Sequence, residues 1–250
     1  MTDTNNIAVR ARECAKCHVG AADRQVNHDL IAAGHPPLKF ELAAYQDMLP
    51  KHWDDRQERC KKPHFELQLW SVGQLASAEA ALRVLQQRAS ASLMQQDKNR
   101  SPQQRIQPAW PELAEYDCFS CHKDLIDPSW RQQRGYHDRR LGMAAWRTWY
   151  YSMPARVAMV ELSGDAVDAY ASQINDLRTL MESQYQTDAI EVAELSGGTL
   201  SQLSPFLSQL AETSAGNHAP EEFPVKFSRQ RGELAQFINA PDGGTKLVST

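Results

Sequence analysis

The chain has 250 residues, of which 42% are hydrophobic and 23% are charged, a composition typical of globular proteins. Its formal net charge is -4, so the composition provides no basic surface for binding nucleic acid. No apolar run approaches the roughly 18 residues that a membrane helix requires, and we therefore expect no membrane span in this chain.

A Cys-x-x-Cys-His motif lies near the N-terminus, and a second copy lies midway along the chain. In c-type cytochromes the two thiols of this motif form thioethers with haem, and the adjoining histidine binds the iron. With five Cys and eight His in the chain, chance would produce about 0.003 copies. We therefore predict two haem c groups. The predicted attachment residues are Cys14, Cys17, Cys118 and Cys121, and the predicted proximal ligands are His18 and His122.

The four motif cysteines have two alternative uses besides haem attachment. Together they could form a four-thiolate zinc site, but zinc does not require a histidine directly after each second cysteine. Thioredoxin-like chemistry is disfavoured because neither pair stands between a strand and a helix. The fifth cysteine, Cys60, is flanked by Arg59 and Lys61, and its basic neighbours favour a reactive thiolate if it has a function at all.

The remaining pattern is helical, and no strand pattern persists. Apolar spacing predicts a helix over residues 19–34, ended by Gly34 and the two prolines that follow His35. Further helices are expected over residues 38–49, 65–96, 156–186 with a break at 163–164, 200–210 and 231–238. Residues 51–63 read as a solvated connection, and residues 97–111 as a polar linker.

We divide the chain into two regions. Residues 1–153 are expected to form a dihaem-binding domain, and residues 154–250 a helical cap, which contains only His218 and no cysteine. Residues 127–154 are rich in Trp, Tyr and Arg, which could either pack on porphyrin and bind propionates or form an ordinary aromatic core with a charged rim.

Two six-coordinate haems need two distal ligands. His28 and His35 are the preferred candidates, because seven residues of helix would separate them by about 10 Å and let them serve different irons. Gly34 allows a close backbone approach to a haem edge beside His35. The other candidates are His52, His64 and His137, with Met48, Met143 and Met153 as thioether options.

Several stretches carry a family resemblance: CAKCHVG, NHDLIAAGHPPLKFELAAYQDMLPKHW, WSVGQLASAEAALRVLQQRA, WPELAEYDCFSCHKDL and SWRQQRGY. Over residues 12–150 the chain resembles the C-terminal portion of bacterial multihaem c-type cytochromes of the cytochrome c-552/c-554-like group. The resemblance implies a mainly α, multihaem cytochrome c fold, with helices and loops around closely packed haems and histidine on both sides of each iron. It also matches His28 and His35 to histidines of the family pattern, and it implies further haem domains upstream.

These observations predict electron transfer to redox partner proteins in the periplasm or another extracytoplasmic space, although the stretch MTDTNNIAVRARE is no signal peptide. A first alternative is a haem enzyme whose open iron site acts on a nitrogen oxide or peroxide. A second alternative is a structural zinc-binding protein. No nucleotide-binding or hydrolase signature accompanies the motifs, which favours the electron carrier.

Overall fold

The computed structural model describes residues 6–50, 52–62, 65–95, 110–122, 127–128, 136, 139–154, 157 and 164–213. The helices α1 to α5 are Ile7–His18, His28–Ala32, Leu42–Met48, Arg56–Lys61 and Phe65–Gln95. They are followed by the 3-10 turns η2 (Leu113–Glu115) and η3 (Cys118–Ser120), and by α8 (Gly164–Ser183) and α9 (Ala189–Thr213). Within these ranges there is no strand, only two isolated bridges, so the prediction of a mainly α fold is confirmed for the described chain.

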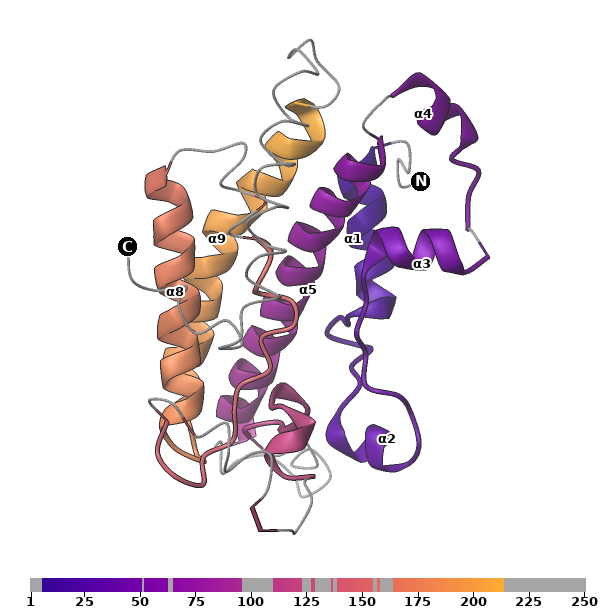
Figure 1. The fold of residues 1–250 in the computed structure, drawn as a ribbon. Helices are drawn as coiled ribbons and strands as arrows, with labels where there is room; N and C mark the ends of the chain where they lie inside the picture. The colour runs from indigo at the N-terminus through magenta and orange to yellow at the C-terminus, as the bar shows by residue number, and fades with distance from the viewer. Residues whose placement is uncertain are drawn as a thin grey trace.

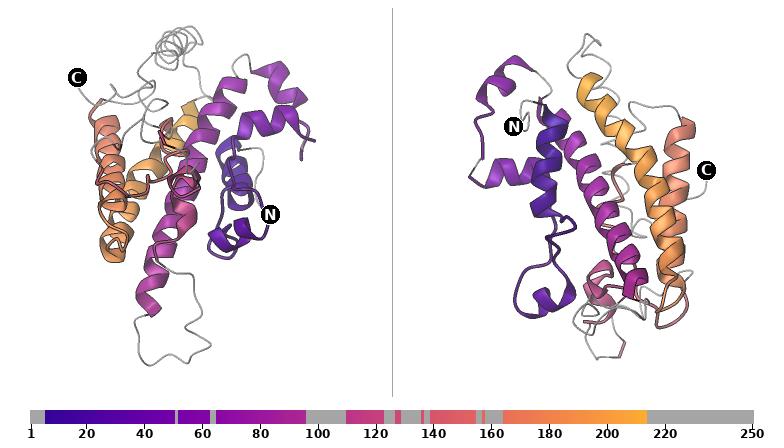
Figure 2. Two further views of the ribbon diagram at one scale, coloured as in Figure 1. Left: turned by 60° about the horizontal axis from the view of Figure 1, so that its bottom comes forward. Right: turned by 180° about the vertical axis from the view of Figure 1, so that it is seen from behind.

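The long helix α5 is the centre of the fold. It lies between α1 on one side and α9 on the other, and α8 packs against α9 (Figures 1 and 2). Leu69, Val72, Leu82 and Leu85 of α5 are almost fully buried. The sequence prediction for residues 65–96 is confirmed by this helix up to its last described residue, Gln95.

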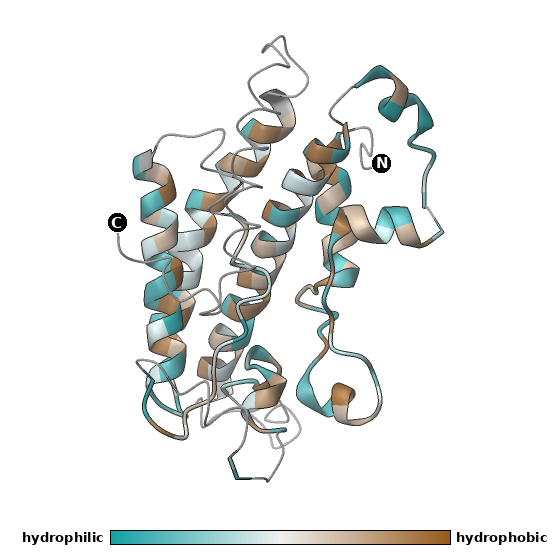
Figure 3. Cartoon of the chain, in the orientation of Figure 1, coloured by the Kyte–Doolittle hydropathy of each residue, from teal (hydrophilic) through white to brown (hydrophobic). Residues whose placement is uncertain are grey.

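The C-terminal helices share one core with the N-terminal half. A single cluster of buried residues includes Ile7 of α1, Leu82 of α5, Met181 of α8 and Leu207 of α9. Figure 3 shows apolar and polar residues alternating along α8 and α9, as expected of helices that bury one face. The apolar core therefore continues across the boundary that we placed after residue 153.

The predicted helix over residues 19–34 is wrong for most of its length. The chain instead leaves a helix at His18, passes through Gly20 with φ of 143°, and forms a bridge between Ala21 and Arg24. A new helix, α2, begins at His28, where the Asn27 side chain accepts a hydrogen bond from the amide of Leu30. The positive φ of Gly20 and the N-cap at Asn27 interrupt the single helix that apolar spacing alone predicts.

Two other expectations also need correction. The stretch over residues 51–63 contains helix α4, whose Glu58 binds the buried Arg10 through two hydrogen bonds of 2.8 and 2.9 Å. The C-terminal helix α9 is far longer than the predicted 200–210, because packing on α5 overrides the weak helix propensity of Gly197, Gly198 and Pro205. Helix α8 is described from Gly164 to Ser183, and the break at residues 163–164 stands at the edge of the described residues and stays a prediction.

Some predictions lie outside the described residues. They concern His64, His137, His218, the helix over residues 231–238 and most of the linker over residues 97–111. Among the helices that are described, none combines the length and apolar character needed to cross a membrane.

Candidate functional site

The first motif occupies the C-terminal turn of α1. Cys14 is followed at the third position by Cys17 and at the fourth by His18, the spacing that places side chains on one face of a helix. The Cys14 side chain is half-buried and Cys17 is exposed. The helix thus presents two thiols and one imidazole together, as attachment of a single haem requires.

The His18 ring lies in an aromatic setting. It stacks on Phe40, with ring centroids 4.8 Å apart and an interplanar angle of 13°, and meets the edge of Tyr45 at 5.4 Å. Burial, and secondarily the positive charge of His52, lowers the pKa of His18 below its ordinary value. The neutral imidazole, which is the form that binds metals, is therefore favoured.

The thiols of the first motif differ in their surroundings. Burial raises the pKa of Cys14, an effect that the nearby Arg10 partly opposes. The exposed Cys17 accepts a hydrogen bond of 3.5 Å from the guanidinium of Arg24, a residue of the bridge that follows α1. The first thiol is accordingly held in its protonated form, and the second is open to solvent.

The second motif has the same one-turn geometry outside a long helix. The amide of His122 donates to the carbonyl of Cys118 at 2.8 Å, and that of Cys121 donates to the same oxygen at 3.2 Å. The Asp117 side chain caps the turn by accepting from the amide of Phe119. Cys118, Cys121 and His122 are all exposed, so both motifs present Cys, Cys and His from one helical turn.

A short antiparallel contact fixes this second turn to the body of the protein. Tyr116 and Trp146 form a bridge, the amide of Asp117 donates to the carbonyl of Ala145 at 2.8 Å, and the amide of Arg147 donates to the carbonyl of Glu115 at 2.8 Å. The amide of Trp146 in turn donates to the buried carboxylate of Glu182 in α8. The turn that carries the second motif is therefore held by the C-terminal helices.

The structure brings His28 next to His122. Their ring centroids lie 6.3 Å apart with an interplanar angle of 24°, although they come from distant parts of the sequence. Two imidazoles on opposite sides of one metal ion have centroids about 6 Å apart, since each metal–nitrogen bond measures about 2.0 Å. The separation thus suits one iron held by both rings.

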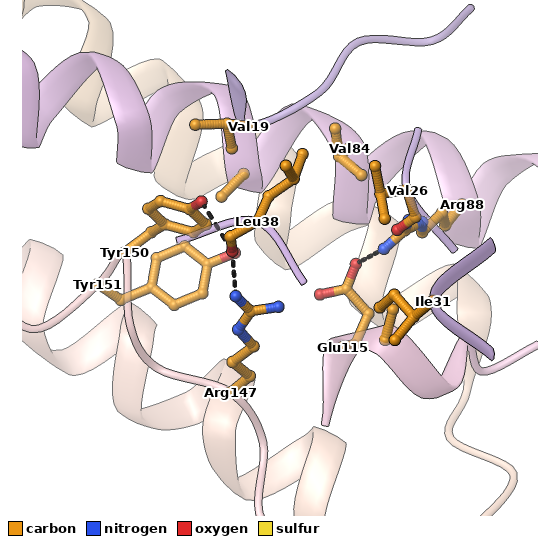
Figure 4. Close-up of a pocket in the computed structure, with 12 residues that line it drawn as sticks. Val19, Val26, Ile31, Leu38, Val84, Arg88, Glu115, Arg147, Tyr150 and Tyr151 are labelled. Atoms are coloured by element: carbon orange, nitrogen blue, oxygen red, sulfur yellow. Dashed lines mark hydrogen bonds and ion pairs between the residues drawn. The ribbon is translucent and has the colours of Figure 1, made fainter. Parts of the chain in front are cut away.

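A partly open groove lies between α5 and the segments that follow and precede the two motifs (Figure 4). The cavity within it has a volume of about 50 Å³. In it Arg88 pairs with Glu115, while Arg147 and Tyr150 both donate to the carbonyl of Leu38. The apolar part of the wall includes Val19, Val26, Ile31, Leu38 and Val84. This cavity is far smaller than the roughly 300–1,000 Å³ of a typical ligand pocket, so the groove provides an apolar wall and not a formed pocket.

The other candidate ligands lie in different settings. His35 is exposed, and its Nδ1 atom lies 2.7 Å from the carbonyl oxygen of Pro36. His52 is exposed as well, and it lies near enough to affect the pKa of His18. Among the methionines, Met48 is 80% exposed and Met143 is buried.

The four motif cysteines do not meet at one point. Among the described residues, which include all four, no group of three or more His, Cys, Asp or Glu side chains is arranged to hold a metal ion. The fifth cysteine, Cys60, is exposed on α4 and forms no disulfide.

The segment rich in Trp, Tyr and Arg has two roles. Trp146 stacks on Tyr151 with centroids 4.6 Å apart, and both belong to the apolar core. Tyr151 also lines the groove, together with Arg147 and Tyr150. Phe40 could not be named from the sequence, because no local pattern indicates its contact with His18. Comparisons with known protein families, curated proteins and solved structures find no match to this chain.

Proposed function

We propose that this protein is an electron carrier with two covalently attached haems, one at each Cys-x-x-Cys-His motif. The observation that carries the proposal is that both motifs, on unrelated local structures, present Cys, Cys and His from one helical turn. Thioether attachment needs two thiols at this spacing, and iron ligation needs the histidine beside them. Bound haem would supply one-electron redox chemistry at these positions.

The residues present fit such groups. Cys17, Cys118 and Cys121 are exposed and open to reaction, and the lowered pKa of His18 keeps that imidazole neutral. His122 and His28 have the separation of two ligands on one iron. Stacking on Phe40 fixes the plane of the His18 ring, a role that residues around a metal ligand commonly serve.

The groove supports the same proposal. Its aliphatic wall follows the first motif at Val19 and flanks His28 at Val26 and Ile31, so apolar surface lies next to both sets of ligands. Arg147 brings a guanidinium to the same space, and guanidinium groups suit the propionates of haem. With His28 opposite His122, the iron at the second motif would have no coordination position for a substrate, which favours electron transfer over catalysis at that haem.

Haem attachment can be tested directly. The chain is produced with an export signal in a bacterium that matures c-type cytochromes, then denatured and extracted with acid acetone. We expect the absorbance to stay with the polypeptide at two haems per chain. Replacing Cys14 and Cys17 with Ser should leave one haem, whereas the matched control Cys60→Ser should keep both. Extraction of all haem, or zinc binding without a Soret band, would overturn the proposal.

Attachment of haem c normally takes place outside the cytoplasm, so the proposal includes a periplasmic or comparable location and redox proteins as partners. The test compares haem attachment in the chain fused to an export signal with haem attachment in the chain expressed without one. Haem attachment that occurs equally well without export would contradict the location.

A further inference from the structure

The buried carboxylate of Glu112 joins the two segments that carry His28 and His122. Its side chain is largely hidden from solvent, at 6% exposure. One oxygen, Oε1, accepts from the amide of His28 at 2.8 Å and from the amide of Ala114 at 3.1 Å. Amides in the first turn of a helix have no partner within that helix. The single atom Oε1 therefore accepts a hydrogen bond from one such amide in α2 and from one in η2.

Helix α2 has little else to hold it. None of its residues is buried, so packing in the core does not fix the direction in which His28 points. The Asn27 cap bonds to Leu30 within the same segment and does not tie it to the body of the protein. Just ahead of α2, Arg88 of α5 donates to the carbonyl of Val26 at 3.1 Å. Glu112 provides the bond at His28 itself.

The partner side of this bond is well anchored. Glu112 opens η2, whose last residue, Glu115, accepts from the amide of Arg147 and pairs with Arg88. The second motif begins three residues after Glu115, and the amide of Asp117, just before the motif, donates to the carbonyl of Ala145. A hydrogen bond from His28 to Glu112 consequently sets the position of His28 relative to the turn that carries His122.

We infer that Glu112 is a positioning residue that keeps the His28 imidazole opposite His122, within reach of the same iron. The inference rests on the proposed dihaem function. Glu112 touches neither the iron nor the thiols; it acts through the backbone of His28. Because the bond is charge-assisted and shielded from water, its loss frees the exposed helix α2 to move away from the second motif.

The test uses the full dihaem protein and compares Glu112→Ala, Glu112→Gln and His28→Ala. In Glu112→Ala we expect about half of the haem to change from low-spin to high-spin, as in His28→Ala, with both haems still attached. Glu112→Gln keeps an acceptor oxygen and should restore most of the low-spin signal. Adding Glu112→Ala to His28→Ala should cause no further change, and free imidazole should restore the low-spin form of Glu112→Ala.

Asp188→Ala is the matched control, because this side chain also accepts from two backbone amides, those of Ile190 and Glu191, at the start of α9. It should leave both haems low-spin. If the Glu112→Ala protein does not fold well enough to be purified, Glu112→Gln decides the question. The neutral amide oxygen of Gln is a weaker acceptor than the carboxylate, so warming should change one haem from low-spin to high-spin at a lower temperature than in the parent protein.

A fully low-spin Glu112→Ala protein, or a Glu112→Gln protein with the parent's conversion temperature, overturns the positioning role. Absence of thioether-linked haem from the parent protein is a different result, and it would instead refute the proposed function.

Discussion

The carboxylate of Glu79 lies 2.7 Å from the guanidinium nitrogen Nε of Arg12, inside the contact between α5 and α1. The same carboxylate accepts from Arg83 at 2.7 Å and from the hydroxyl of Ser204 in α9 at 3.0 Å. The Glu79 side chain is only 4% exposed. One buried acid therefore links the helix that carries the first motif to the central helix and to the C-terminal helix.

Replacing Glu79 with Ala should destabilise the fold strongly. A hydrogen bond to a charged group contributes about 1.5–3 kcal/mol, and Glu79→Ala removes several of them, whereas Arg12 and Arg83, at 32% and 55% exposure, keep access to water. The measurement is the free energy of unfolding from urea titration. Arg83→Ala is the control: this side chain is 55% exposed, and loss of such an ion pair costs about 1 kcal/mol or less. Equal costs for the two variants would contradict the linking role of Glu79.

The same residue predicts a pH dependence. Burial acts to raise the pKa of Glu79, but hydrogen bonds from Arg83 and Arg12 outweigh burial, and the pKa lies below the ordinary value of 4.5. The folded protein therefore binds this proton less readily than the unfolded chain does. The stabilisation is complete above the unfolded-state pKa and is lost as the pH falls through the lower folded-state pKa.

We expect the stability difference between the parent and Glu79→Gln to be largest near neutral pH and to shrink in acid. The check is urea unfolding of both proteins at a series of pH values from neutral to below the ordinary glutamate pKa. Other carboxylates titrate in both proteins, so their contributions largely cancel in the difference. A difference that grows as the pH falls would show that the sign is wrong.

Gly20 lies two residues after His18, the last residue of the first motif, and has a backbone conformation that other residues rarely adopt. Its φ is 143°, and an added Cβ would lie 3.1 Å from the Val84 side chain of α5. Gly20→Ala should cost about 1–3 kcal/mol from backbone strain, with a further cost from the contact. Gly34→Ala is the matched comparison, because Gly34 has φ of 107° but no atom within 4 Å of an added Cβ. Urea unfolding should show the larger loss for Gly20→Ala.

The elements that the sequence predicted best are those with long, regular apolar spacing. Helix α5 was found because leucines such as Leu75, Leu82 and Leu85 recur at helical intervals and all become buried. Helix α1 was missed because, apart from Ile7, its buried face consists of small or charged residues, among them Ala11, Ala15 and Arg10. Its burial is fixed by α5 and by Glu58, which local periodicity cannot reveal.

The residues of the candidate site fall into two similar groups, those that a local pattern reveals and those that only the fold brings together. The motif residues are local in sequence and could be named from it. The approach of His28 to His122, and the carboxylate of Glu112 between their segments, depend on chain segments brought together only by folding. Those relationships leave no trace in spacing or composition.

The last prediction concerns His35, which the sequence proposes as a distal ligand. In the structure its Nδ1 atom lies 2.7 Å from the carbonyl oxygen of Pro36. A carbonyl only accepts hydrogen bonds, so in the neutral ring Nδ1 carries the proton and Nε2 carries the lone pair. Metal-binding histidines commonly have this arrangement, in which a carbonyl orients the ring through the nitrogen that does not bind the metal.

We therefore expect His35→Ala to keep both haems attached but to convert one from low-spin to high-spin. The reduction potential of the converted haem should rise, since loss of an imidazole donor destabilises the ferric iron. Carbon monoxide should then bind rapidly to half of the haem, whereas the parent should bind it slowly.

His52→Ala is the decisive comparison, because His52 is the histidine whose charge acts on His18. If His52→Ala opens one iron and His35→Ala does not, the ligand is His52. If the parent already binds carbon monoxide rapidly at half of its haem, one iron is open, and the pure electron-transfer proposal gives way to a haem enzyme.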